Sequence, residues 1–203
     1  EGGFARIERI TRKDTAKIYW KVTTPDNTTT FFGLTQEAQL FDPENPTKIY
    51  AWLPSFSFDD KGNWIIFEYK AEDLAKVPNE LHEKNRLNGP ARFANRYLKR
   101  VKYCNRNPWY SDHPYIPNLP GENVEYFFEL VMDYGEHKDP EDDDQPPDYQ
   151  ELRPWEARPD AFSSYRSGFE IRTYRRCFNI LMFHHFPEET QRDGSDFGIN
   201  YLV

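Results

Sequence analysis

The sequence predicts an all-β fold built mainly of antiparallel hairpins, with few short helices and long loops. Three observations favour this class. Runs of β-branched and aromatic residues recur along the chain, and such residues are enriched in strands. Clusters of Gly, Pro, Asn and Asp separate these runs as turn formers do. Strand-like runs follow one another with few helical segments between them, which is typical of an antiparallel sheet.

The first third of the chain predicts a β-meander followed by a less regular stretch. Residues 4–32 form the meander, because strand-like runs at 17–22 and 28–32 flank a Pro-Asp-Asn turn. Residues 35–40 could form one short helical turn. Residues 42–46 contain two prolines, so we expect no regular structure there.

The middle of the chain continues with strands and one long loop. Residues 48–53 are a strand candidate, and the Asp-Asp-Lys-Gly-Asn sequence at 59–63 is a strong turn signal before a strand at 64–69. Residues 71–91 are polar and predict a surface loop that could hold one short helix. Residues 97–103 fit both a helical face and strand alternation, and we favour the strand.

Two further loops flank the clearest strand of the chain. Residues 105–121 contain four prolines and predict a loop, whereas 126–135 predict a strand that is apolar, and therefore covered, on both faces. Residues 136–150 form an acidic excursion that predicts a solvated loop. A calcium site there is rejected, because Asp142, Asp143 and Asp144 are consecutive and no EF-hand spacing surrounds them.

The last segment, 155–186, combines a polar approach with a long apolar run. From Gly168 the residues alternate as in a strand, Arg175 and Arg176 predict a bend or a bulge, and residues 178–186 are apolar almost throughout. Five arginines lie here near acids, and we expect their guanidinium groups to lock the approach against neighbouring strands: Arg158, Arg166, Arg172, Arg175 and Arg176, near Asp160 and Glu170.

The composition limits the possible partners of the protein. Asp and Glu (34) exceed Lys and Arg (26), and the resulting net charge of −8 argues against nucleic acid and anionic membranes as main partners. No apolar run approaches the roughly 18 residues of a membrane helix. We expect Cys104 and Cys177 to be small buried side chains, with a disulfide between them left open. The chain begins without Met, so we expect a single β-rich segment, 1–203, of a longer protein.

No residue is assigned to a catalytic, cofactor-binding or metal-binding site, and no cofactor is expected. His184 and His185, with Glu188, Glu189, His137 or His113, suggest a metal site. Adjacent residues of a strand point to opposite faces, however, so the pair cannot readily hold one ion.

The same segment offers no nucleophile motif. Ser163, Ser164 and Cys177 lack a G-x-S-x-G elbow, and we interpret the Ser-Ser pair as a turn. Aromatic residues interleaved with polar ones could stack on sugars, although strand spacing favours their packing in the core: Tyr19, Trp20, Trp52, Trp64 and Trp109.

A set of short sequence motifs occurs in a fixed order along the chain. They are EGGFARI at 1–7, YWKVT at 19–23, DKGN at 60–63 with EY at 68–69, NRYLKRVKY at 95–103, DYGEH at 133–137 and, as the longest, residues 158–186. Together these motifs resemble the SpvB/TcaC family, which comprises the plasmid virulence protein SpvB and the B component of insecticidal Tc toxin complexes. The chain departs from the family pattern at Cys104, where glycine is expected.

The resemblance implies a secreted scaffold rather than an enzyme. It implies hairpins like those of RHS/YD-repeat proteins, wound into a β-shell that encloses a toxic polypeptide. The partners would be the rest of the same B-type chain, a C-type toxin component and, through regions outside this chain, an A-type pore component. Nothing in the chain resembles the ADP-ribosyltransferase domain of SpvB. The alternative is a self-standing β-sandwich that binds carbohydrate.

Overall fold

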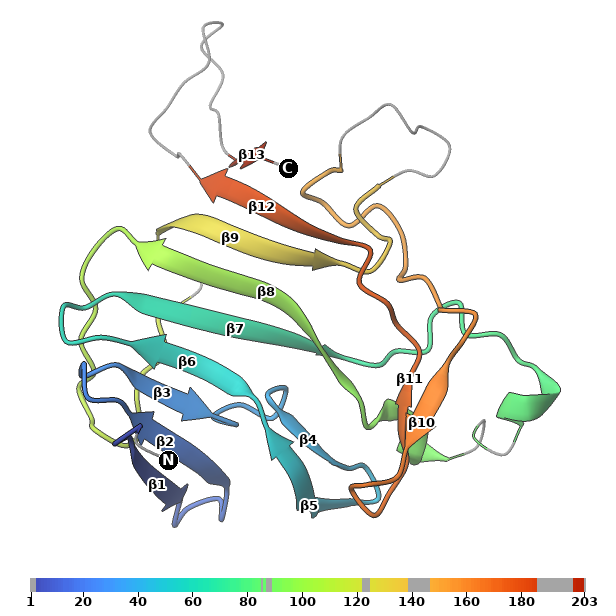
Figure 1. Ribbon diagram of the computed structural model, residues 1–203, viewed down its shortest axis with the longest axis horizontal. Helices are drawn as coiled ribbons and strands as arrows, with labels where there is room; N and C mark the ends of the chain where they lie inside the picture. Colours follow the sequence, from blue (N-terminus) through green and yellow to red (C-terminus); the bar gives the residue numbers. More distant parts are fainter. Residues whose placement is uncertain are drawn as a thin grey trace, which may run out of the picture.

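The chain forms one long twisted antiparallel sheet with two small hairpins beside it (Figure 1). This computed structural model describes residues 3–84, 86, 89–121, 125–138, 147–185 and 199–202. Nine strands form the main sheet, in the order β1-β2-β3-β6-β7-β8-β9-β12-β13. Their bounds are β1 Arg6–Thr11, β2 Ile18–Thr23, β3 Thr29–Phe32, β6 Pro54–Phe58, β7 Trp64–Ala71, β8 Arg96–Asn105, β9 Tyr126–Asp133, β12 Asn179–His185 and β13 Ile199–Leu202.

The predicted N-terminal meander and the turn after it are confirmed. Strands β1, β2 and β3 pair in sequence, and β6 and β7 form the next hairpin. The Asp59 carboxylate closes the β6–β7 turn by accepting hydrogen bonds from the backbone N–H groups of Lys61 and Asn63, at 3.0 and 2.9 Å. Gly62 has a φ of +88°, and a Cβ at this position would lie 2.8 Å from Pro108 Cβ. The turn therefore needs glycine both for its backbone conformation and for the space beside the 105–121 loop.

The prediction for residues 35–46 is wrong. No helix forms there; instead β4 (Gln39–Asp42) and β5 (Asn45–Trp52) make a separate two-stranded hairpin. Pro46 lies inside β5. A proline has no N–H to donate, but an edge strand needs only one side of its backbone for pairing, so this small hairpin tolerates it.

The strand predicted at 97–103 is confirmed as β8, which pairs with β7 and β9. Cys104, near its end, has a φ of +62°, in the left-handed region that favours glycine. The backbone thus keeps the conformation of the expected glycine although a cysteine stands there. The prediction that both cysteines are buried is wrong, because Cys104 and Cys177 are exposed free thiols.

The C-terminal segment supplies one sheet strand and one separate hairpin. Strand β12 pairs with β9 along most of its length. Strands β10 (Phe162–Ser164) and β11 (Ile171–Thr173) form a two-stranded hairpin beside the sheet (Figure 1), so the interpretation of Ser163-Ser164 as a turn is wrong. The bend or bulge expected at Arg175-Arg176 falls in the irregular stretch between β11 and β12, where the strand pattern is interrupted.

The two polar excursions are more buried than the sequence predicts. In 71–91 and the following residues, two short 3-10 turns form, η1 (Leu81–Glu83) and η2 (Pro90–Phe93), yet Glu72 and Glu83 are only 3% and 2% exposed. In 136–150, Glu136 and His137 are fully buried. Asp142, Asp143 and Asp144 lie outside the described residues. The prediction of purely solvated loops therefore fails at these four buried side chains.

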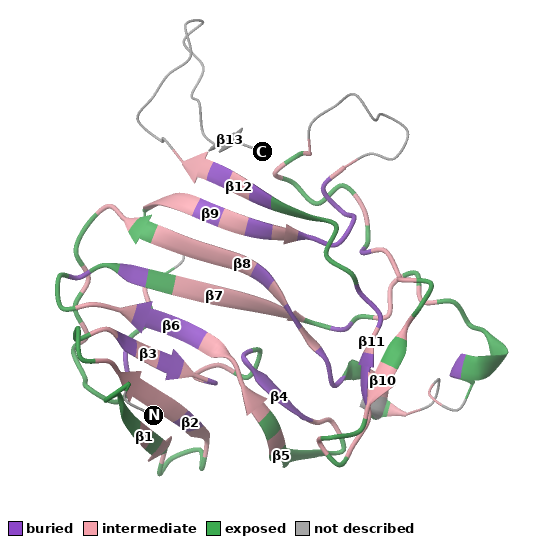
Figure 2. Cartoon of the chain, in the orientation of Figure 1, coloured by how far each residue is buried: buried purple, intermediate pink, exposed green. Residues whose placement is uncertain are grey.

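Aromatic side chains supply the main core on one face of the sheet. Tyr19, Phe31, Phe56 and Trp64 form its largest cluster. A second cluster, Tyr97, Tyr134 and Trp155, joins β8 to the C-terminal segment. Buried positions alternate along the central strands (Figure 2), and the second face of β9 is only half-buried, contrary to the prediction that both its faces are covered.

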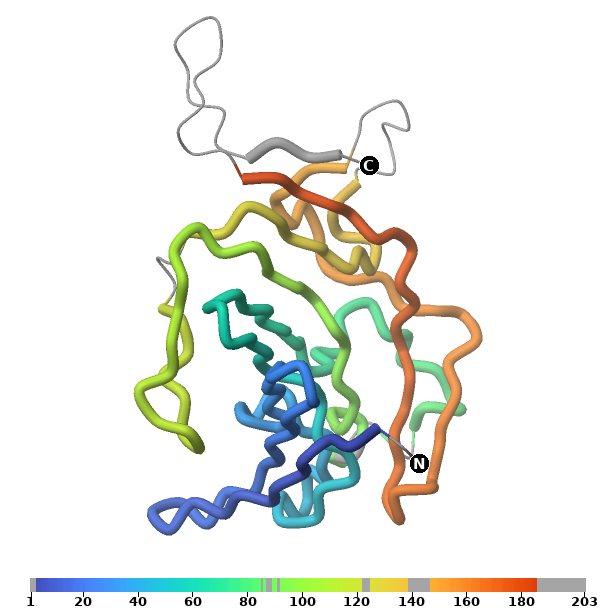
Figure 3. Tube along the Cα trace, turned by 60° about the vertical axis from the view of Figure 1, so that its left-hand side comes forward, coloured from blue at the N-terminus to red at the C-terminus, as the bar shows by residue number. Residues whose placement is uncertain are grey.

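The 105–121 loop covers the N-terminal half of this core. It descends beside the first strands, where Figure 3 shows it in yellow-green. Trp109 packs edge-on against Phe56, with 4.9 Å between ring centroids, and Tyr19 Oη donates to the Tyr115 carbonyl at 2.7 Å. Across the described ranges no helix has both the length and the apolar character that a membrane crossing requires.

Candidate functional site

Arg175 is the most completely bonded side chain of the segment that the sequence singled out. Its guanidinium group is buried, and the neighbouring groups accept from all five of its N–H donors. Glu72 accepts from Nε and Nη2, Asp73 accepts from Nη2 at 3.0 Å, and the carbonyls of Ala75 and Trp155 accept from Nη1 at 2.8 and 3.0 Å. A buried charge is stable only when paired and hydrogen-bonded in this way.

Arg172 makes a second buried ion pair beside the first. Its Nη2 donates to Glu83, and its Nη1 donates to Ser163 Oγ at 3.2 Å. Tyr174 Oη donates to the other Glu83 oxygen at 2.6 Å. Burial alone would raise the pKa of Glu83, but the hydrogen bonds from Tyr174 and Arg172 outweigh it and lower that pKa. We call Arg172 and Arg175, with Glu83 and Glu72, the arginine clamp.

The predicted role of the arginines is confirmed for some of them only. Arg158 binds Asp160 through two hydrogen bonds of 2.8 Å, but this pair lies within the approach and does not join it to a neighbouring strand. Glu170, however, pairs with Arg86 at 2.7 Å rather than with one of the five arginines. The acids that bind the clamp come from residues 71–91, which the sequence analysis treated as solvated. No local sequence signal links these partners, because about 90 to 100 residues separate them.

A cluster of polar side chains surrounds the buried Lys99 near the end of β9. Lys99 Nζ contacts Glu136 Oε1 and lies 2.8 Å from His137 Nε2. His137 Nδ1 donates to the Asp148 carbonyl at 2.8 Å, which leaves Nε2 as an acceptor for the ammonium group. Among the described residues, Glu136, His137 and Glu151 are the group whose spacing would suit a metal ion. The lysine ammonium supplies the positive charge between them.

A third polar cluster surrounds Glu129, which is fully buried on β9. Its carboxylate accepts from Arg100 Nη1 at 2.8 Å and from Tyr149 Oη at 3.1 Å, and it lies 3.0 Å from His185 Nε2. Burial would raise the pKa of Glu129, but the hydrogen bonds from His185 and Arg100 lower it to about 2. The cluster ties β8, β9 and β12 to the segment that returns at Tyr149.

The structure does not assemble the histidine set that suggested a metal site. His185 faces Glu129, whereas His184 packs edge-on against Phe128 with 4.7 Å between ring centroids. His113 lies in the 105–121 loop, where its Nδ1 accepts from two backbone N–H groups. Glu188 and Glu189 lie outside the described residues. His137 belongs to the Lys99 cluster, which the sequence analysis missed although the DYGEH phrase contains it.

The candidate nucleophiles have structural partners. Ser163 Oγ donates to Glu170 at 2.5 Å, within the β10–β11 hairpin. Cys177 Sγ donates to the Asn179 carbonyl at 3.0 Å. Although Cys177 as a whole is exposed, local desolvation of its thiol and the charge of Asp133 raise its pKa, which is opposite to the change that activates a thiol.

The aromatic residues weighed for sugar stacking pack inside the protein. Trp64 and Tyr19 belong to the main core, and Trp109 covers it. Trp52 Nε1 donates to the Ile18 carbonyl at 3.0 Å, and its ring meets Trp20 edge-on. The packing interpretation is therefore confirmed for this set.

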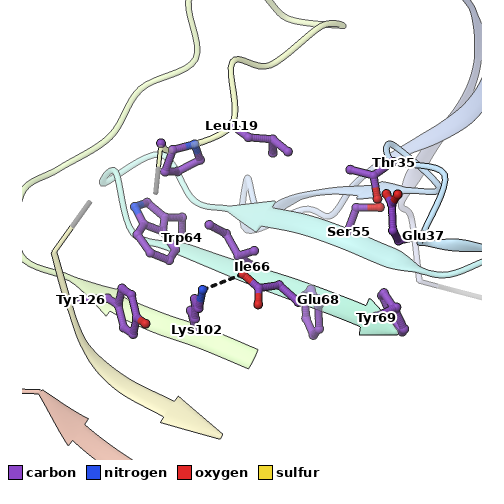
Figure 4. A pocket seen from close by; sticks show the side chains of 13 residues that line it. Thr35, Glu37, Ser55, Trp64, Ile66, Glu68, Tyr69, Lys102, Leu119 and Tyr126 are labelled. Atoms are coloured by element: carbon purple, nitrogen blue, oxygen red, sulfur yellow. Dashed lines mark hydrogen bonds and ion pairs between the residues drawn. The ribbon is translucent and has the colours of Figure 1, made fainter. Parts of the chain in front are cut away.

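A cleft of about 460 Å³ opens between the sheet and the 105–121 loop. Figure 4 shows Trp64 and Tyr126 at one end, Thr35 and Glu37 at the other, and Leu119 above them. Ile66, Ser55, Tyr69 and the ion pair of Glu68 with Lys102, 2.6 Å long, also line it. This volume and this mainly apolar lining are typical of ligand sites.

Comparison with known proteins gives one consistent family. The family model described as SpvB, Salmonella virulence plasmid 65kDa B protein, matches residues 1–186. Proteins named Mono(ADP-ribosyl)transferase SpvB from Salmonella typhimurium (strain 14028s / SGSC 2262) and Salmonella dublin are each 35% identical over 190 residues, or 93% of this chain. The match covers 31% and 30% of those proteins, so the chain spans less than a third of their length.

Solved structures agree with this assignment. The N-terminal domain of effector protein SpvB from Salmonella typhimurium strain LT2 matches with a TM-score of 0.84 and 32% identity, over 100% of this chain and 59% of that one. The TcdB2-TccC3-Cdc42 structure gives 0.83 at 30% identity, over 99% of this chain and 9% of the other. The Photorhabdus luminescens Tc holotoxin pore gives 0.82 at 30% identity, again over 99% and 9%.

These matches distinguish the two predictions made from the sequence, a segment of an SpvB-like scaffold and a carbohydrate-binding β-sandwich. The all-β prediction is confirmed, and the matching part of SpvB is its N-terminal region rather than its C-terminal ADP-ribosyltransferase domain. The carbohydrate-binding β-sandwich is not favoured, because the described strands form one nine-stranded sheet with two small hairpins.

Proposed function

Because this chain belongs to the SpvB family, we propose that it is a structural segment of a Tc-toxin-B-like virulence protein and contributes to a β-shell around a toxic polypeptide. It has no catalysis of its own. The observation that carries this proposal is the fold match to chains of TcdB2-TccC3 assemblies, which extends over 99% of this chain.

The internal chemistry supports a static role. The chemistry-bearing side chains of the three polar clusters bind one another: Arg175 with Glu72, Lys99 with Glu136, and Arg100 with Glu129. Groups that satisfy each other in the protein interior hold segments in place and are not free to act on a substrate.

The partners follow from the same proposal. They are the remainder of the B-type chain, a C-type component that completes the shell and supplies the enclosed polypeptide, and an A-type pore component that other regions of the protein contact. We propose a secreted protein. The net charge of −8 agrees with the absence of nucleic acid from this set of partners.

Protease protection tests this function. In a complex of the complete protein with its C-type component, the enclosed polypeptide should resist added protease. Arg175→Met, which disrupts a buried ion pair, should expose that polypeptide to cleavage. Arg158→Met removes an exposed pair and is the matched control, so protection should persist. Undiminished protection in the Arg175 variant, despite local unfolding of this segment, would contradict a contribution to the shell.

A further inference from the structure

An irregularity of the sheet holds Lys99 inside the protein. Strand β8, which carries this residue, lies between β7 and β9 (Figure 1). A β-bulge interrupts the pairing of β8 with β7 between Glu68 and Tyr69, and Lys99 is the extra residue, because its two neighbours pair with these residues. Bulges commonly redirect side chains next to functional sites. The Lys99 side chain is only 8% exposed, so its amine lies in the protein interior.

The turn that follows β9 fixes Glu136 opposite this amine. The side chain of Glu136 is fully buried, and its Oε1 contacts Lys99 Nζ. Its Oε2 accepts a hydrogen bond from the backbone N–H of Tyr134 at 2.7 Å. Gly135, between these two residues, has a φ of +97°, which lets the chain turn back on itself. One carboxylate oxygen is thus held by a backbone donor, as oxyanions are held in many active sites, while the other contacts the amine.

His137 lies where a base for this amine is needed. Its Nδ1 donates to the Asp148 carbonyl at 2.8 Å, so Nε2 carries a lone pair. This nitrogen lies 2.8 Å from Lys99 Nζ and 3.6 Å from Glu136 Oε1. A base at hydrogen-bond distance from a nucleophile is the usual arrangement that activates it. His137 is therefore positioned to take protons from the nitrogen and to pass them to the oxygen.

The surroundings keep these three groups together and largely away from water. Glu136 and His137 are fully buried, and the Trp155 ring lies 5.8 Å from Lys99 Nζ. Glu151 Oε1 lies 3.5 Å from Nζ on the solvent side, since its side chain is 42% exposed. Groups held in contact react as if at an effective concentration of about 10⁵–10⁸ M, which favours a bond that does not form between separate molecules in water. Exclusion of water also opposes hydrolysis of that bond.

We propose that Lys99 and Glu136 condense to an intramolecular amide, an isopeptide bond, with His137 as the base. His137 Nε2 transfers a proton from the ammonium group to Oε1, and the neutral amine attacks the carboxyl carbon. Negative charge develops on Oε2, where the Tyr134 N–H stabilises it. His137 then transfers a second proton from the nitrogen to Oε1, the bond from carbon to Oε1 breaks, and one water molecule leaves. The net charge of the pair stays zero, and the reaction consumes no oxidant, reductant or cofactor.

The bond joins β8 to the turn after β9, across a sequence separation of 37 residues. A covalent link of this kind restricts the unfolded chain and stabilises the fold as a disulfide does, but it does not depend on the redox conditions. The inference does not rest on the shell function, because it uses only contacts within this chain.

Peptide mapping of the complete protein that contains this chain tests the bond. The protein is denatured and digested with trypsin, and the peptides are identified by mass spectrometry. An amide at Lys99 blocks cleavage after this residue, so residues 97–100 should be joined to residues 107–138 in one branched peptide. Its mass should be the sum of the two peptide masses minus one water molecule. Fragmentation should place the branch at Lys99 and Glu136.

Three variants identify the reacting groups. Lys99→Arg keeps the positive charge but presents a much weaker nucleophile, so the branched peptide should be lost. Lys102→Arg is the matched control: it makes the same change in the ion pair with Glu68, whose side chains are 22% and 41% exposed, and the branched peptide should persist. His137→Phe removes the base and should slow bond formation about a hundredfold or more in a time course after cell-free synthesis.

Two results would overturn the proposal. One is a folded wild-type protein whose digest contains residues 97–99 as an unmodified peptide and no branched peptide. The other is a branched peptide that persists in Lys99→Arg, because a different residue would then form the link.

Discussion

Replacement of Arg175 by methionine should destabilise the domain more than any change at an exposed arginine. The methionine keeps much of the side-chain volume but removes five hydrogen bonds and the positive charge. Glu72, which is 3% exposed, would then hold a buried carboxylate with no opposite charge. Breaking one partner of a buried pair costs about 3–5 kcal/mol. Since domains of this kind are stable by about 5–15 kcal/mol, the loss is a large part of the total.

Urea unfolding of the 203-residue chain, followed by tryptophan fluorescence, measures this loss. The Arg175→Met midpoint should fall well below that of wild type. The double variant Glu72→Gln/Arg175→Met should recover part of the difference, because the neutral amide does not leave a buried charge. Arg158→Met is the matched control and should unfold near the wild-type midpoint, since its partner Asp160 is exposed. If Arg175→Met and Arg158→Met unfold together, the clamp does not stabilise the fold.

Three further predictions concern single sites. Cys104→Gly should raise the free energy of unfolding by about 1 kcal/mol, because glycine relieves the strain of a φ of +62°, whereas Cys104→Val should lower it; urea midpoints check both. Glu129 has a pKa of about 2 against an ordinary 4.5, so its stabilising effect is complete above pH 4.5 and is lost as the pH falls through 2. Glu129→Gln should therefore unfold at a lower urea concentration than wild type at pH 7. Its urea midpoint should also fall less than that of wild type between pH 4.5 and pH 2. Lys99→Ala should leave Glu136 and His137 without their cation, so zinc should raise the thermal midpoint of this variant and not that of wild type.

The strands were predictable because they depend on local chemistry. Alternation and β-branched residues define β2, β7 and β8 wherever a turn signal bounds them, and the Asp59 turn is explained by its own four neighbours. The hairpin of β4 and β5 was missed for the converse reason. Its prolines signal irregular structure locally, and only its position outside the main sheet makes Pro46 acceptable in a strand.

The polar interior could not be predicted from local patterns. Glu72 and Glu83 lie in sequence typical of a solvated loop, and nothing near them indicates burial. Their burial depends on Arg175 and Arg172, which are 103 and 89 residues away. A carboxylate is buried only when it is paired with an opposite charge. The burial of Glu72 and Glu83 therefore cannot be predicted without knowing which residues pair with them. The family motif at 133–137 contains Glu136, but nothing in this motif indicates that Lys99 pairs with it.

The same pairs explain how a chain so rich in charge holds a fixed shape. Glu72 precedes the excursion that leads to η1, and Arg175 follows β11, so one ion pair fixes both segments against the sheet. Glu83, which follows Glu72 in the chain, and Arg172, which precedes Arg175, form a second link of the same kind. A buried charge in either segment is unfavourable until its partner in the other segment is present. The two segments should therefore order together, and the acidic residues that are in excess in the sequence supply contacts that join distant parts of this chain.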